Sequence, residues 1–160
     1  MLRIIQDTYI INEKTVAIYP AKKIEYDATV ITLDGLKLVK QTPFQIIKYS
    51  CEAYWACYHS RRQATVKRTN FQRNVPIMIN PERELITFPT HAPTNYECAW
   101  IFIKHVARLT RCTEHKKQTP IVFKNGYDLL IKKSYNIISN QYNRAETCLE
   151  IYRKENEHTA

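Results

Sequence analysis

The sequence predicts an α+β fold that combines a mainly antiparallel β-sheet with one central helix and one C-terminal amphipathic helix. Short runs of β-branched and aromatic residues, separated by turn-forming residues, recur along much of the chain. Residues 44–58 and 135–152 instead space apolar side chains at the helical period. With 160 residues, 44% hydrophobic and 24% charged, the chain has the size and composition of a single domain over 1–160.

The N-terminal part contains two predicted β-hairpins. Residues 8–19 are expected to form two short strands around a polar turn at 12–14, because β-branched and aromatic residues dominate both sides. Residues 28–39 contain two apolar runs around Asp34-Gly35. An Asp-Gly pair suits the positive φ values of tight hairpin turns, so the second hairpin is the clearer of the two.

The central helix is expected to begin at Thr42-Pro43, since Thr can cap free backbone N–H groups and Pro fits the first helical position. Its apolar face consists of Phe44, Ile47, Cys51, Tyr54 and Tyr58. Such a stripe usually lies in a core, so packing is favoured over base stacking for Tyr54 and Trp55. The spacing leaves open whether the basic residues that follow continue the helix or form a loop.

Three more strands are predicted between residues 75 and 103. Two of them, 75–79 and 85–88, are joined by the turn-forming Asn80-Pro81. Residues 98–103 are apolar on both faces, and their β-branched and aromatic content favours a buried strand over a helix. If the next segment were helical, its cations would share one face; these are Lys104, Arg108 and Arg111. That alternative stays open.

The C-terminal part is predicted to be a hairpin followed by a helix. Residues 119–123 and 127–131 lie on either side of Asn125-Gly126, a strong hairpin signal. From Ser134, apolar residues at alternating steps of three and four form a heptad-like seam. The seam either packs on the protein's own sheet or forms a dimer contact, and the residues of that contact would be Tyr135, Ile138, Tyr142 and Leu149.

The net charge of +9 is concentrated in two segments. Residues 53–81 contain five Lys or Arg and no Asp or Glu, and residues 98–133 contain eight Lys or Arg against two Asp or Glu. A protein that binds a polyanion needs clustered cations without competing carboxylates, because each phosphate contact releases counterions. Two Gly in the whole chain cannot form the glycine-rich phosphate loops of common nucleotide-binding enzymes.

We therefore predict a nucleic-acid-binding protein whose cations contact phosphate or the minor groove. The first expected group is Arg61, Arg62, Lys67, Arg68 and Arg73, and the second, which would extend the footprint along the duplex, is Lys104, Arg108, Arg111, Lys116 and Lys117. An exposed Lys or Arg is commonplace by itself, so the clustering carries the prediction.

The five Cys form no CxxC pair and are odd in number, which suits reduced thiols in the cytoplasm. A zinc site from Cys98, His105, Cys112 and His115 is disfavoured because its spacings are not the short paired ones that zinc sites use. No cofactor is expected. A thiolate enzyme would need Cys98 with His91 or His105, or Cys57 with His59, and no family signature surrounds these residues.

No stretch of the sequence approaches the length of a membrane span, and Asp7 interrupts what would be the apolar core of a signal peptide. We therefore expect a cytoplasmic protein that acts at the nucleoid and has no membrane partner.

Three blocks of the sequence resemble the ComK family, the competence transcription factors of Gram-positive bacteria. They are PFQIIKYSCEAYWACYHSRRQAT at 43–65, VPIMINPERELITFPT at 75–90 with CAWI at 98–101 and His105-Val106, and FKNGYDLLIKKSYNIISNQYNRA at 123–145. From the first block to the last they span residues 43–145, about two-thirds of the chain. The chain departs from the family at Ser60, where Gly is common before the Arg, so we expect a less tight turn at Arg61.

The resemblance implies a transcriptional activator of DNA-uptake genes, often including its own gene. It would bind paired A/T-rich boxes through the minor groove of double-stranded promoter DNA and bend the duplex. It would act as a dimer or a pair of dimers. RNA polymerase and a Clp protease adaptor would be further partners.

Two other functions remain open from the sequence. Longer family members continue past the last helix, whereas this chain stops at Ala160. A regulatory relative that binds a protein partner without activating transcription is therefore one alternative. A basic module that binds RNA is the other.

Overall fold

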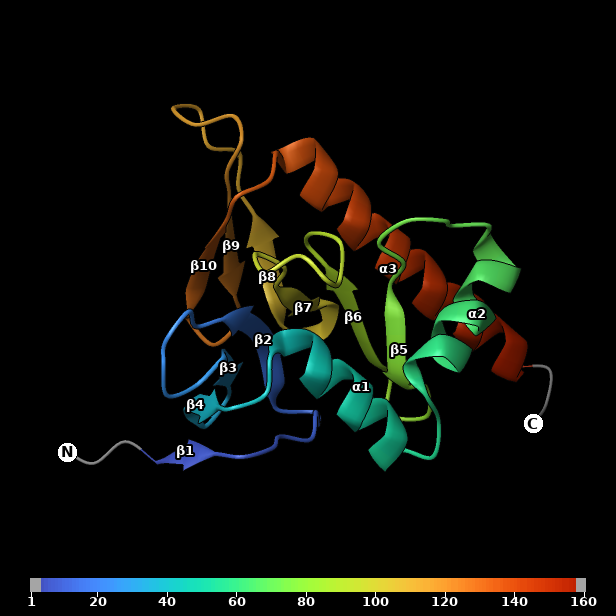
Figure 1. Ribbon diagram of the computed structural model, residues 1–160. Helices are drawn as coiled ribbons and strands as arrows, with labels where there is room; N and C mark the ends of the chain where they lie inside the picture. The colour runs from blue at the N-terminus through green and yellow to red at the C-terminus, as the bar shows by residue number, and fades with distance from the viewer. Residues whose placement is uncertain (1–3, 158–160) are drawn as a thin grey trace.

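The computed structural model describes residues 4–157, and its centre is a seven-stranded sheet in the order β1-β4-β3-β2-β7-β6-β5 (Figure 1). The parallel pair β1 and β4 forms one edge, and every other neighbouring pair is antiparallel. The strands are β1 (Ile5–Gln6), β2 (Thr15–Pro20), β3 (Ala28–Thr32), β4 (Gly35–Val39), β5 (Ile77–Asn80), β6 (Leu85–Pro89) and β7 (Trp100–Phe102).

A second, three-stranded antiparallel sheet has the order β10-β9-β8. It consists of β8 (Val106–Leu109), β9 (Thr119–Phe123) and β10 (Asp128–Ile131). The chain passes from the large sheet to the small one through a single 3-10 turn, η1 (Ile103–His105). The loop between β8 and β9 projects from the body of the molecule (Figure 1).

Three helices accompany the sheets: α1 (Pro43–Ala53), α2 (Tyr58–Thr69) and α3 (Tyr135–Glu157). As predicted, α1 begins at Thr42-Pro43. The Thr42 side chain accepts from the Gln45 backbone N–H, and the Gln45 side chain accepts in return from the Thr42 N–H, a capping box. This reciprocal cap fixes where α1 starts.

The large sheet lies between two apolar clusters. One cluster joins α1 to the sheet through residues such as Ile46, Ile47 and Trp100. The other packs Phe88 and Ile101 on the opposite face against the small sheet and α3. Because the central strands are buried on both faces, their sequences are almost continuously apolar instead of alternating.

The structure confirms the α+β class and the mainly antiparallel sheet, and corrects several details. Two helices precede the C-terminal one where a single central helix was expected, because α1 ends at Ala53 and α2 begins anew. Residues 8–12 form no strand, so the expected 8–19 hairpin is wrong; Ile11 is instead buried under α1. The alternative left open after β7 is decided by the 3-10 turn η1, which contains Lys104, and the strand β8, which contains Arg108, so no α-helix aligns these cations.

The two clearer hairpins are confirmed, with one shift. The turn between β3 and β4 is Leu33-Asp34, one residue earlier than expected, and Gly35 has φ 117° where it pairs with Thr32. Gly126, with φ 94°, closes the turn between β9 and β10. The strands predicted at 75–79, 85–88 and 98–103 also form, and their observed bounds are 77–80, 85–89 and 100–102.

Candidate nucleic-acid interface

The first group of predicted cations lies on α2 and the loop that follows it. The helix starts at Cys57, whose side chain accepts from the Ser60 N–H, and ends at Asn70 in the left-handed conformation. Thr65 is its one buried residue, so α2 is an exposed helix along most of its length. Ser60 lies inside the first helical turn, so Arg61 stands on a helix and the turn expected there does not exist.

The five cations of this group differ in exposure and in whether their side chains are already bonded to other residues. Lys67 and Arg73 are exposed and form no ion pair within residues 4–157. Arg62 donates to the Gln72 carbonyl at 2.8 Å and so ties the following loop to α2. The Arg61 side chain is half-buried, and its Nε has no hydrogen-bond partner among the described residues. Lys67 and Arg73 are therefore the cations best placed for phosphate.

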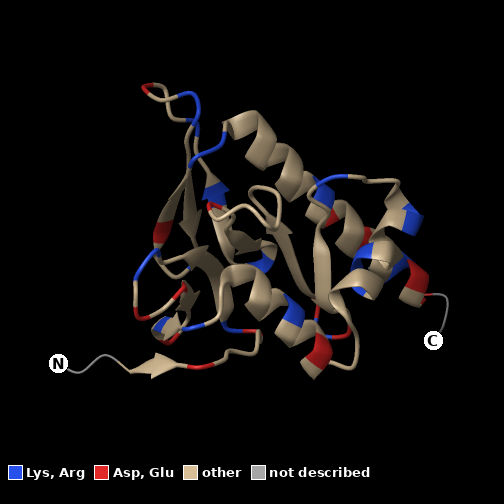
Figure 2. Ribbon diagram, viewed as in Figure 1, with Lys and Arg blue, Asp and Glu red and all other residues tan. Residues whose placement is uncertain are grey.

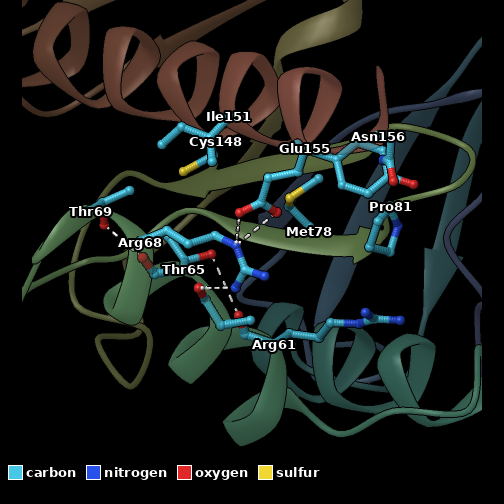
Figure 3. Close-up of a pocket in the computed structure, with 12 residues that line it drawn as sticks. Arg61, Thr65, Arg68, Thr69, Met78, Pro81, Cys148, Ile151, Glu155 and Asn156 are labelled. Carbon is cyan, nitrogen blue, oxygen red and sulfur yellow. Dashed lines mark hydrogen bonds and ion pairs between the residues drawn. The ribbon is translucent and has the colours of Figure 1, made fainter. Parts of the chain in front are cut away.

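Arg68 is engaged in a contact that the sequence does not reveal. Its Nε donates to both carboxylate oxygens of Glu155 on α3, at 2.9 and 3.0 Å, and its guanidinium also donates to the Ala64 carbonyl. Figure 3 shows Arg68 reaching from α2 to Glu155, whereas Arg61 extends in another direction. Folding thus brings the Glu155 carboxylate, which is 87 positions away in sequence, to residues 53–81, which contain no Asp or Glu.

The space between α2 and α3 is a cavity of about 300 Å³ (Figure 3). Met78, Cys148 and Ile151 contribute apolar walls, and Arg61 and Arg68 contribute cationic ones. Burial raises the pKa of the Cys148 thiol to about 11, with Arg144 opposing the shift, so the thiol stays neutral. The cavity separates the two helices but contains no reactive group.

The residues of the second predicted group do not all lie in one region of the structure. Arg108 on β8 and three cations of the β8–β9 loop, Arg111, Lys116 and Lys117, are all exposed. Lys104 is exposed too, but it lies elsewhere, at a small depression that Glu13 and Glu84 also line. Its positive charge contributes to holding the pKa of Glu84 below its usual value, after the larger effect of the hydrogen bond from Arg153. Lys104 thus stands among carboxylates.

The two cation groups lie at opposite ends of α3. Arg111 stacks on Tyr135 at the start of the helix, 4.2 Å from the ring centroid, and Arg68 pairs with Glu155 near its end. Twenty residues of helix separate these contacts by about 30 Å. Figure 2 shows the same separation, with Lys and Arg gathered on α2 and its following loop and again on the β8–β9 loop.

The four residues predicted for oligomerisation differ in their environment. Ile138 is fully buried in the cluster on the α3 side of the sheet, and Tyr142 and Leu149 pack against that cluster while partly exposed. Tyr135 is half-exposed under Arg111. At Ile138 the seam therefore packs on the protein's own sheet. A dimer contact through Tyr135, Tyr142 and Leu149 stays a prediction.

Trp55 is exposed to solvent, so the prediction that it packs in the core is wrong. Packing was favoured for both Tyr54 and Trp55, and Tyr54 does pack, with its hydroxyl donating to the Ile11 carbonyl at 2.6 Å. The Trp55 side chain, however, is 99% exposed. The helix ends one residue before Tyr54, so the helical period no longer applies at Trp55.

The cysteine and histidine pairs that a thiolate enzyme would need, which the sequence disfavoured, have other hydrogen-bond partners. The Cys98 thiol donates to the backbone carbonyl of His91, and burial raises its pKa to about 11. The His91 ring instead bonds to the Thr90 hydroxyl, and His105 donates from Nε2 to the Glu13 carbonyl. Cys57 is exposed and bonds to Ser60. Within residues 4–157, no three His, Cys, Asp or Glu side chains gather as metal ligands.

None of the helices between residues 4 and 157 combines the length and the apolar character that crossing a membrane requires.

Comparison with known proteins finds similarity over most of the chain. Residues 6–157 match the family described as ComK protein. A competence transcription factor from Bacillus subtilis (strain 168) is 31% identical over 142 residues, which cover 86% of this chain and 71% of that protein. No solved structure matches the chain.

Proposed function

The chain belongs to the ComK family, and from this membership we propose that it is a competence transcription factor that activates its genes by binding duplex DNA. The observation that carries the proposal is α2 with its following loop, an exposed segment in which Lys67 and Arg73 are free to meet phosphate. The relative's name, competence transcription factor, supports the biological role.

We further propose that the DNA is A/T-rich and is bound through the minor groove. A·T and T·A pairs present the same acceptors there, so a protein that binds in this groove needs few base-specific contacts. A-tracts narrow the groove and deepen its negative potential, which attracts inserted Arg side chains. The fold offers cations of this kind on α2.

Paired boxes would require more than one copy of the chain or two contact regions on one copy. The groups at the two ends of α3 provide two regions about 30 Å apart, close to one turn of B-DNA. A homodimer that forms through the exposed parts of Tyr135, Tyr142 and Leu149 would double the number of these contact regions. RNA polymerase and a Clp protease adaptor remain proposed partners.

The deciding experiment is a salt titration of binding to A/T-rich and G/C-rich duplexes of equal length, followed by fluorescence anisotropy. We expect tighter binding to the A/T-rich duplex at every salt concentration. The variants Lys67→Gln and Arg73→Gln should each make the negative slope of log K against log salt less steep by about 1, because each removes one phosphate contact.

Lys37→Gln is the matched control for charge. It removes one cation from β4, near the edge of the sheet opposite to β5 and α2, and should leave the slope unchanged. Equal affinity for the two duplexes would contradict the A/T preference. Slopes that respond to Lys37→Gln as strongly as to Lys67→Gln would remove α2 from the interface.

A further inference from the structure

The corner between α1 and α2 presents a large aromatic side chain to solvent. Trp55 is 99% exposed, whereas the chain's other tryptophan, Trp100, is fully buried. An exposed Trp at this corner gains nothing from the hydrophobic effect. The folded protein alone therefore gives no reason for an indole at this position.

The backbone at Trp55 makes the choice of residue more unusual. Its φ is 63°, in the left-handed region that Gly and Asn adopt at helix ends with little or no strain. A bulky side chain at such a position carries strain, and strain of this kind is typically retained at functional sites. Trp55 thus departs from two general preferences. Large apolar side chains are usually buried, and left-handed corners usually contain Gly.

Hydrogen bonds hold the backbone of the corner in place. The Trp55 N–H donates to the Glu52 carbonyl at 3.1 Å, and the Ala56 N–H donates to the Cys51 carbonyl at 3.0 Å. On the preceding residue, the Tyr54 hydroxyl bonds to the Ile11 carbonyl, which anchors the corner to the core. The indole therefore projects from a fixed support, as a group that must enter a narrow space requires.

The charges around the corner favour a polyanion on balance. Arg61 and Arg62 lie within the first turns of α2, which begins two residues after Ala56 and has no acidic residue in its first turn. Arg61 is close enough to Cys51 to affect the pKa of that thiol. Glu52 is the carboxylate nearest to Trp55 in sequence, and it is exposed.

We propose that Trp55 is a wedge that inserts between base pairs of the bound duplex from the minor groove and bends it. This proposal rests on the proposed DNA binding and names the residue that deforms the DNA. Apolar wedges of this kind unstack a base step, and flanking cations then hold the bent backbone. The cations nearest to Trp55 along the chain are Arg61 and Arg62, and the freer Lys67 and Arg73 follow on α2 and its loop.

The test compares Trp55→Gly and Trp55→Phe with the wild-type protein on an A/T-rich duplex labelled at both ends for energy transfer. Glycine removes the wedge and relieves the positive φ, so the melting temperature should stay equal or rise while the bend is lost. Affinity should fall about tenfold, since one stacking contact is lost. Phenylalanine keeps a smaller wedge and should retain part of the bend.

Tryptophan fluorescence gives an independent readout. DNA should quench the exposed Trp55 of the wild-type protein and leave the buried Trp100 emission, so the quenching should vanish in Trp55→Phe. Glu52→Gln is a further variant and should strengthen binding, because it removes the carboxylate beside the wedge.

Each contrary outcome has a distinct meaning. A wild-type protein that does not bind the A/T-rich duplex would overturn the proposed function itself. A Trp55→Gly protein that binds and bends the duplex as the wild type does would overturn the wedge alone. A loss of bending that accompanies dissociation of a dimer in sedimentation would assign Trp55 to a contact between copies of the chain. Tighter binding of wild type to single-stranded RNA than to duplex would overturn the proposed function.

Discussion

At the scale of single residues, two buried histidines connect the core to solution pH. His105 donates to the Glu13 carbonyl, and His91 bonds to the Thr90 hydroxyl. Burial is the main cause that lowers the pKa of both from 6.5, and nearby lysines lower it further. Both side chains therefore stay neutral in the folded protein at a pH where the unfolded chain would already protonate them.

This difference predicts a loss of stability in mild acid. Below a pH of about 6.5 the unfolded chain takes up protons that the folded chain does not, so the free energy of unfolding falls as the pH drops toward the folded pKa values. We expect the melting temperature to decrease between about pH 7.5 and about pH 5.5. His105→Gln should flatten part of this decrease. His59→Gln, which changes an exposed residue of α2, should keep the wild-type pH dependence.

At the scale of elements, the contact between α2 and α3 controls how free one cation is. Both side chains of the Arg68–Glu155 pair are about half-exposed, at 46% and 49%. A pair with that exposure stabilises a protein by at most about 1 kcal/mol. The contact therefore matters less for stability than for whether Arg68 can meet phosphate.

We predict that Glu155→Gln strengthens duplex binding with little change in melting temperature. Arg68 would then be free to contact phosphate, which should make the negative slope of log K against log salt steeper by about 1. Glu150→Gln, a change of equal charge at another exposed position of α3, should leave that slope close to the wild-type value. If both variants changed the slope alike, net charge and not the release of Arg68 would be the cause.

At the scale of the whole molecule, the distance between the two cation groups predicts a dependence on duplex length. The β8–β9 loop and α2 lie about 30 Å apart along α3. A hairpin stem of about 6 bp is about 20 Å long and cannot reach both groups, whereas a duplex of about 30 bp can.

Removing the loop cations should therefore matter only on the longer DNA. Lys116→Gln combined with Lys117→Gln should make the negative salt slope less steep by about 2 on the 30-bp duplex and leave it unchanged on the stem. A reduction of equal size on both lengths would mean that one duplex segment meets the two groups together. Gel-shift or anisotropy titrations with the two lengths would decide between these results.

Much of the fold followed from local signals in the sequence. Thr42-Pro43 defined the start of α1, because a capping residue and a proline act within one turn of the chain. Asp34-Gly35 and Asn125-Gly126 predicted two hairpins, since few residues tolerate positive φ. The prediction of strands at 8–11 was wrong because β propensity says nothing about which backbone finds a pairing partner.

The sequence by itself determined the class of fold, the two basic segments and the resemblance to a family of DNA-binding regulators, because composition, turn chemistry and capping are properties of short stretches. Only the tertiary structure decided which cations are free, since Glu155 reaches Arg68 across 87 positions. It also decided that Tyr54 is anchored in the core while its neighbour Trp55 faces solvent, because the path of the chain after α1 is set by packing and not by the helical period.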